Sequence, residues 1–130
     1  MAEYTVANLK EIDNQGHHFG IDPNDFEIRM ARVGLDCEHC GISYARLAPG
    51  FRQPYGHRHK RQEEIYVLVS GSARMKLDDE VIDLEPWSAV RVPPVTMRAV
   101  EGGPEGAELL VVGAPNTGPG DGENVPGWWS

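Results

Sequence analysis

Short apolar segments separated by glycine and proline make up most of this chain and restrict the folds that it can adopt. From Phe26 onward, about nine segments enriched in β-branched and aromatic residues follow one another at a spacing typical of short strands. No segment has the apolar period of an amphipathic helix. The series therefore predicts an all-β sandwich or barrel. The expected strands are residues 27–33, 42–47, 64–70, 73–77, 81–84, 89–92, 96–100 and 107–112, with one more around the histidines at positions 57 and 59.

Composition and charge exclude several classes of protein. With 130 residues, of which 40% are apolar and 25% are charged, the chain fits one globular domain. Its 12 basic and 20 acidic residues give a formal net charge of −8, which repels nucleic acid and anionic membrane surfaces. No apolar run is long enough to span a membrane, and the first residues lack the pattern of a secretory signal. We therefore expect a cytoplasmic protein that binds neither nucleic acid nor membranes.

Two histidines and a glutamate form the most informative motif of the sequence. His57 and His59 are two residues apart, so on a β-strand both imidazoles point to the same face. Glu64, on the next strand, could reach the same point. Two neutral imidazoles and one carboxylate suit a divalent ion such as iron, zinc, nickel or manganese, and they leave positions open for a substrate. Taken alone, a His-x-His pair often means only two exposed histidines on a strand.

Together with the strand that follows, these residues resemble the first motif of the cupin family. The spacing His57-x-His59-x4-Glu64-x6-Gly71 agrees with that motif at all the ligand positions, although its leading glycine is displaced by one residue. Glu63 fits the shorter histidine–glutamate spacing that the motif also allows. Only Glu64 places Gly71 correctly, so we predict Glu64 as the ligand.

The second cupin motif, which supplies a fourth ligand, is altered in this chain. It corresponds to residues 92–98, where Pro93 is kept, Val95 replaces a glycine and Arg98 replaces the ligand histidine. A guanidinium cannot ligate a metal ion and repels one that is close. Arg98 would instead pair with Glu64, or turn aside to hold the carboxylate or phosphate of a substrate.

The resemblance implies a double-stranded β-helix, or jelly-roll barrel, whose mouth holds the site, and it implies a homodimer. We place an N-terminal extension at residues 1–25, the barrel at 26–112 and a Pro/Gly-rich tail at 113–130. Two adjacent tryptophans near the end indicate that the tail packs on the barrel or on a partner subunit. An immunoglobulin-like sandwich would use the same strands, but it gives the histidine pair no role.

Three classes of function follow from these residues. The first is a metal-dependent enzyme, such as an oxygenase, isomerase or decarboxylase, that acts on a small molecule through an ion on His57, His59 and Glu64. The second is a metal-free binding module in which Arg98 anchors an anionic ligand. The third is a structural or regulatory homodimer that keeps the motif as a relic. The ligand contacts predicted for the first two are Arg98, Tyr66, Met75 and Met97.

The only cysteines, Cys37 and Cys40, form a C-x-x-C pair. A thioredoxin-like redox pair needs a βαβ unit, and a zinc site needs further ligands of the same kind. Neither is evident from the sequence, although a zinc site that uses His39, or one that is shared between two subunits, stays an alternative. We interpret the pair as two reduced thiols in a hairpin turn.

Overall fold

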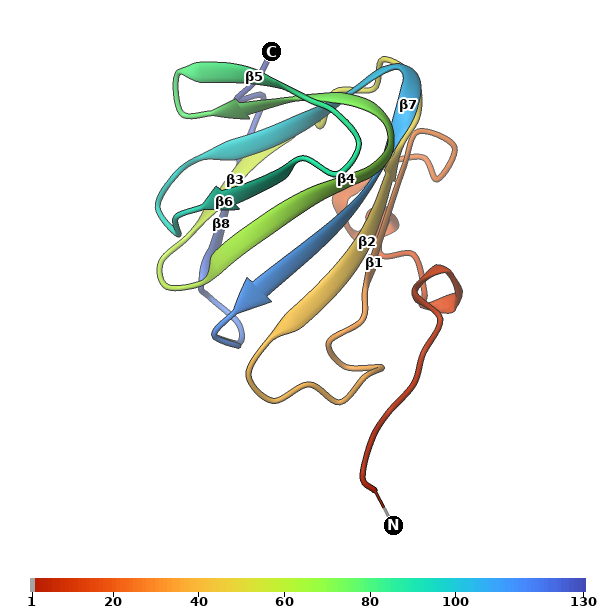
Figure 1. Ribbon diagram of the computed structural model, residues 1–130. Coiled ribbons are helices and arrows are strands. Elements are labelled where there is room, and N and C mark those ends of the chain that lie inside the picture. Colours follow the sequence, from red (N-terminus) through yellow and green to blue (C-terminus); the bar gives the residue numbers. More distant parts are fainter. Residues whose placement is uncertain (1) are drawn as a thin grey trace.

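Eight β-strands and two short 3-10 helices form the structure, a computed structural model that describes residues 2–130 (Figure 1). The helices are η1 (Leu9–Glu11) and η2 (Gly16–Phe19), both in the N-terminal segment. The described residues contain no helix long and apolar enough to cross a membrane. The strands are β1 (Phe26–Met30), β2 (Gly41–Leu47), β3 (Tyr55–His59), β4 (Glu63–Leu77), β5 (Glu80–Leu84), β6 (Ala89–Val92), β7 (Arg98–Ala114) and β8 (Gly122–Pro126).

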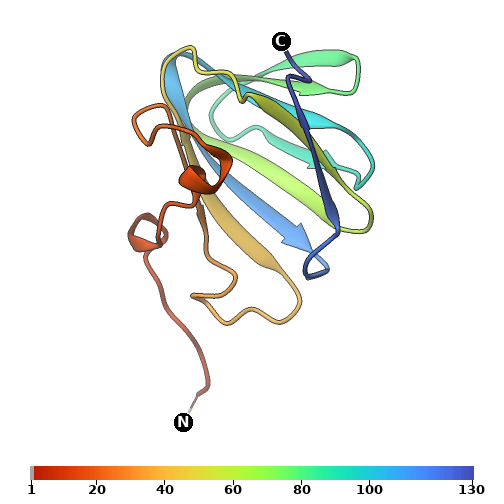
Figure 2. The ribbon, with the colours of Figure 1, turned by 180° about the vertical axis from the view of Figure 1, so that it is seen from behind.

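All strand pairs are antiparallel and belong to one eight-stranded sheet. β7 pairs with β2 and β4, and β4 also pairs with β5 and β6. β3 pairs with β8 along its length and meets β7 only where His57 faces Arg98. Figure 2 shows the curled sheet from behind, with the N-terminal segment on its outer side. Buried apolar side chains fill part of the interior. The all-β barrel predicted from the sequence is confirmed.

Two glycines let the longest strands of the sheet bend together. The pairing of β4 with β7 shifts between Leu68 and Ser70 and again between Gly71 and Ala73. At this point Gly71 has φ +82° and Gly106, on the facing strand, has φ +77°. A Cβ atom on Gly71 would lie 2.0 Å from the carbonyl oxygen of Gly106. The closing glycine of the histidine motif is therefore required by backbone packing.

These bends account for a difference from the expected strands. Residues 64–70 and 73–77 are parts of β4, which runs unbroken for 15 residues. Likewise, residues 98–100 and 107–112 belong to β7, a strand of 17 residues. Glycine and proline usually mark turns in a sequence, but here they mark bulges inside strands that remain paired.

The C-terminal segment continues the sheet beyond residue 112, where the sequence analysis ended the barrel. The ring of Trp128 covers Gly56, where an added Cβ would lie 2.5 Å from it. The ring of Trp129 is only 9% exposed and lies under the guanidinium groups of Arg52 and Arg74, 4.5 and 5.8 Å from the ring centre. These contacts hold β8 against β3. The strand was missed because its sequence, Gly-Glu-Asn-Val-Pro, lacks an apolar alternation.

The bend between β4 and β7 generates a stability prediction. Gly71→Ala should lower the free energy of unfolding by about 3 kcal/mol or more, because the new methyl group meets backbone in a left-handed conformation. Gly50→Ala is the matched control, because Gly50 has φ +72° but open space around its Cβ position. It should cost only about 1 kcal/mol. Urea unfolding measures both, and equal losses would contradict a steric requirement at Gly71.

Candidate functional site

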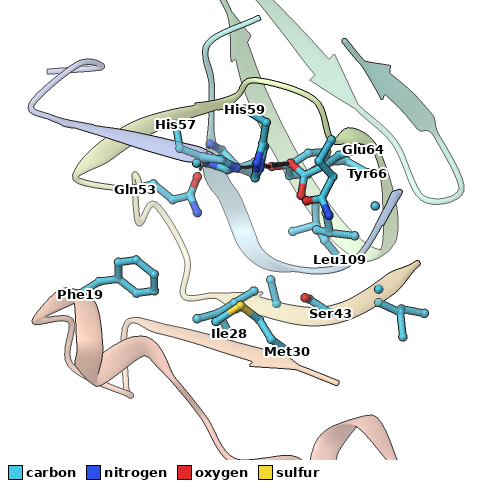
Figure 3. Close-up of a pocket in the computed structure, with 18 of the residues that line it drawn as sticks. Phe19, Ile28, Met30, Ser43, Gln53, His57, His59, Glu64, Tyr66 and Leu109 are labelled. Atoms are coloured by element: carbon cyan, nitrogen blue, oxygen red, sulfur yellow. Dashed lines mark hydrogen bonds and ion pairs between the residues drawn. The ribbon is translucent and has the colours of Figure 1, made fainter. Parts of the chain in front are cut away.

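Side chains from β3 and β4 meet at one end of an internal cavity (Figure 3). His57 and His59 lie on β3, and Glu64 and Tyr66 lie on β4 with the same spacing of two residues. Residues two apart on a strand share a face, so both pairs reach the cavity. Glu63 lies on the other face, where it pairs with an arginine of β6 at 3.2 Å. Of the two candidate glutamates, Glu64 is the one that joins the histidines.

One carboxylate oxygen, Glu64 Oε1, is the point on which these groups converge. It lies 3.3 Å from His57 Nε2 and 3.5 Å from His59 Nε2. The Tyr66 hydroxyl donates a hydrogen bond to it over 3.2 Å, and Arg98 Nη2 lies 3.7 Å away. The Glu64 side chain is only 12% exposed. A largely buried negative charge is thus surrounded by groups that can compensate it.

A second carboxylate, Asp121, orients His59 from the side opposite Glu64. Asp121 is buried, and its Oδ2 lies 3.0 Å from His59 Nδ1. The backbone N–H groups of Arg61 and Gln62 donate to the same carboxylate over 2.9 and 3.2 Å. Although burial opposes ionisation, these hydrogen bonds hold the pKa of Asp121 below its usual value. An ionised Asp121 only accepts hydrogen bonds, so the proton of His59 lies on Nδ1 and Nε2 is left facing Glu64.

Burial and close contact shift the pKa values of the other groups. The Glu64 carboxylate, 3.5 Å from its Nε2, raises the pKa of His59 above 6.5, whereas burial lowers the pKa of His57. Although burial opposes its ionisation, the contacts with both histidines and the charge of Arg98 hold the pKa of Glu64 well below its usual range. Burial raises the pKa of Tyr66 well above its usual value. At neutral pH the site therefore contains an ionised glutamate, a neutral His57 and a protonated tyrosine.

Arg98 is fully buried, and its guanidinium points toward backbone. It donates to the carbonyl oxygens of His57, Pro93 and Pro94 over distances of 3.3, 3.3 and 3.4 Å. These bonds tie the loop before β7 to β3. At 3.7 Å from Glu64 Oε1, the guanidinium also compensates part of the glutamate charge without forming the bidentate pair that the sequence analysis considered.

The cavity itself has a volume of about 290 Å³ and a mostly apolar wall. Tyr66 lines it, but Arg98, Met75 and Met97, which the sequence analysis placed at the ligand, do not. Met75 lies in the core beyond the bend of β4, and the backbone of Met97 is bonded to Asp78 in a turn. Figure 3 shows Phe19, Ile28 and Met30 across the cavity from the histidines, and Leu109 beside Tyr66. The wall is built from Phe19, Phe26, Ile28, Met30, Leu109 and Val111.

Two polar residues at the site escaped the sequence analysis. Asp121 lies 62 residues after His59 in a glycine-rich loop, so no local pattern connects the two. Gln53 lines the cavity and accepts a hydrogen bond from the Val100 N–H over 2.9 Å. This bond leaves its amide NH₂ group available to a ligand. The cysteines Cys37 and Cys40 are free, and among residues 2–130 they belong to no group of side chains that could bind a metal ion.

The triad of His57, His59 and Glu64 fits a divalent metal ion. Two ligand atoms bonded to one ion at about 2.1 Å are separated by about 3.0–3.4 Å in octahedral or tetrahedral coordination. The observed nitrogen–oxygen separations are 3.3 and 3.5 Å, and all three ligand atoms lie within 4.8 Å of one another. His59 Nε2 is buried and makes no hydrogen bond with any described residue. With Nδ1 bound to a carboxylate, this nitrogen takes either a proton or a metal ion.

The convergence on Glu64 generates a prediction for the metal-free protein. Glu64→Gln should lower the pKa of His59, because the carboxylate charge that favours the imidazolium is removed. Glu63→Gln is the matched control, since it removes the same charge one residue away on the outer face. NMR titration of the histidine ring protons measures both. An unchanged His59 pKa in Glu64→Gln would contradict the contact.

Comparison with known proteins identifies the fold. No family model matches this sequence, and no curated protein sequence matches it. Among solved structures, a cupin protein from Bacteroides fragilis is 20% identical with a TM-score of 0.71, and the match covers 89% of this chain and 87% of that one. Pac13 from Streptomyces, a nucleoside dehydratase, is 17% identical with a TM-score of 0.72 over 97% and 92% of the two chains. Oxalate decarboxylase from Bacillus subtilis is 21% identical with a TM-score of 0.72, covering 93% of this chain but 33% of that one. The chain therefore has the fold of the cupin superfamily, as the spacing of its histidine motif predicts.

Proposed function

We propose that this protein binds a divalent transition-metal ion through His57, His59 and Glu64 and acts on a small molecule in the adjoining cavity. The observation that carries the proposal is the convergence of three ligand atoms, with nitrogen–oxygen separations of 3.3 and 3.5 Å and all three atoms within 4.8 Å of one another. The orientation of His59 by Asp121 supports it, because metal-bound histidines usually donate their other N–H to a carboxylate or carbonyl.

The donor set narrows the choice of ion. Two imidazoles and one carboxylate suit iron, zinc, nickel or manganese, and they leave at least one position open to the cavity. A bound ion would supply Lewis-acid polarisation of a substrate oxygen. The full burial of Arg98 beside Glu64 opposes a second positive charge, so we expect a weaker site than one with four protein ligands.

The residues around the triad have definable roles toward a substrate. Tyr66 stays protonated at neutral pH, and its hydroxyl lies 3.2 Å from Glu64 Oε1 and 3.4 Å from His57 Nε2. On substrate binding, its one O–H would turn from Glu64 Oε1 to a substrate oxygen beside the triad. The free amide group of Gln53 offers a second donor. The apolar wall would exclude water and accept the body of the substrate.

Two structural neighbours support an enzymatic role, since they are described as an oxalate decarboxylase and a nucleoside dehydratase. Proteins with this fold thus catalyse different reactions, and a sequence identity near 20% does not indicate which of these reactions this chain would catalyse. We therefore propose enzymatic action on a small molecule and assign no particular reaction.

A metal-free site is the second candidate, and the position of Arg98 favours it. The guanidinium 3.7 Å from Glu64 Oε1 already supplies a positive charge to the buried carboxylate. A protonated His59 would supply another. In this alternative, His57, Tyr66 and Glu64 form a hydrogen-bonded acid–base group without any ion.

Metal binding separates the two candidates. Protein stripped with chelator and titrated with zinc should bind about one ion per chain, as measured by calorimetry and elemental analysis. His59→Ala should abolish binding, and Asp121→Asn should weaken it about 10- to 100-fold because His59 loses its orienting carboxylate. His39→Ala is the control, because the His39 side chain is 94% exposed and does not belong to the triad.

The outcome of this titration is decisive in both directions. Stoichiometric binding that is lost in His59→Ala and kept in His39→Ala supports the proposal. Wild-type protein that binds none of zinc, iron, nickel and manganese contradicts it and supports the acid–base alternative.

A further inference from the structure

One arginine of the cavity wall has no side-chain partner among residues 2–130. Arg32 is the only arginine or lysine among the residues that line the cavity. Within residues 2–130, its side chain forms no ion pair and no hydrogen bond, although the main chain at this position is well anchored. Most other arginines pair with a carboxylate, namely Arg29, Arg46, Arg52, Arg58, Arg74 and Arg91.

The backbone holds Arg32 at the mouth of the cavity. It lies two residues after the end of β1, and its carbonyl oxygen accepts a hydrogen bond from the Cys37 N–H over 2.9 Å. Its aliphatic stem packs over Gly41, where an added Cβ would lie 3.5 Å from Arg32 Cβ and 3.6 Å from Cδ. The absence of a side chain at Gly41 therefore gives the stem room to lie along the cavity rim.

A smaller polar hollow of about 170 Å³ adjoins the cavity at this point. The two share four lining residues, namely Arg32, His59, Gln62 and Gly122. The remaining wall of the hollow comes from the loop around Thr117 and from Asp121. A ligand group placed there would contact the guanidinium of Arg32 and lie beside the histidine triad.

The charges around this polar hollow favour an anion. Its one carboxylate, Asp121, already accepts hydrogen bonds from His59 and from two backbone N–H groups, and it forms no ion pair with Arg32. The guanidinium therefore keeps all its donors for a ligand. Arginine binds carboxylate and phosphate groups through paired hydrogen bonds. The net charge of −8 repels anions at long range, but an unpaired cation in the cavity wall attracts them locally.

We infer that the ligand of this cavity carries a carboxylate or phosphate group, which Arg32 binds at the mouth while an apolar body fills the interior. The inference deepens the proposed function and rests on it for the role of the cavity, but it does not require the metal ion. It also moves the anion anchor from Arg98, which the sequence suggested, to a residue that lines the cavity.

Calorimetry with three probes of equal length tests the inference. The probes are hexanoate, hexyl phosphate and uncharged hexan-1-ol, each titrated into zinc-loaded and chelator-stripped protein. The wild type should bind one or both anions more tightly than the alcohol in both forms, and the preferred anion identifies the ligand class. Arg32→Gln should weaken anion binding by about tenfold and leave the alcohol unaffected.

Two further variants separate the guanidinium from charge in general. Arg32→Lys should retain part of the affinity, since it keeps the charge but loses the paired geometry. Arg61→Gln removes a charge from a nearby exposed residue that lines neither the cavity nor the hollow, so it should change the affinity less than twofold.

Three results would overturn the inference. They are equal binding of hexan-1-ol and the anions by the wild type, no binding of either anion, and unchanged anion affinity in Arg32→Gln. Anion binding that disappears in His59→Ala but survives in Arg32→Gln would mean that the bound zinc ion, and not Arg32, holds the anion. That result would support the metal site and contradict the role of Arg32. Conversely, anion binding to stripped protein that depends on Arg32 would support the inference even if the metal proposal were wrong.

Discussion

The buried carboxylate of Glu64 is the constraint on which the site depends. A carboxylate that is mostly removed from water is stable in ionised form only where hydrogen bonds and positive charges replace its hydration. Here two imidazoles, a tyrosine hydroxyl and a guanidinium converge on the same oxygen. Each of these groups has its own support, because Asp121 orients His59 and three carbonyl oxygens hold Arg98.

The fold brings these groups together through a few long strands. β4 carries Glu64 and Tyr66 into the interior and then bends at Gly71 to pair with β5, while β7 bends beside it at Gly106. The bend lets one sheet curl around the cavity. β8 closes the outer edge of β3 and, through the loop that precedes it, delivers Asp121 to His59. The shape of the barrel and the chemistry of the site thus depend on the same strands.

The sequence predicted those parts of the structure that depend on local spacing. The alternation of strands and turns indicated the all-β class. His57, His59 and Glu64 lie within eight residues, where strand geometry places both histidines on one face and a short connection brings Glu64 near them. The orientation of Arg98 was not predictable, because it depends on carbonyl groups of a loop whose path the sequence does not determine. Asp121 and Arg32 reach the site from loops that are distant in the sequence. Their positions depend on how the barrel closes, so no local pattern predicts them.

The central claim is that Glu64 Oε1 and the two histidine Nε2 atoms form one coordination sphere. The most direct test is a crystal structure of zinc-soaked protein with anomalous diffraction measured on both sides of the zinc absorption edge. The account predicts a single zinc peak about 2.0–2.2 Å from His57 Nε2, His59 Nε2 and Glu64 Oε1, with Asp121 still bonded to His59. A peak at Cys37 and Cys40 instead, or no peak and a closed contact between Arg98 and Glu64, would contradict it.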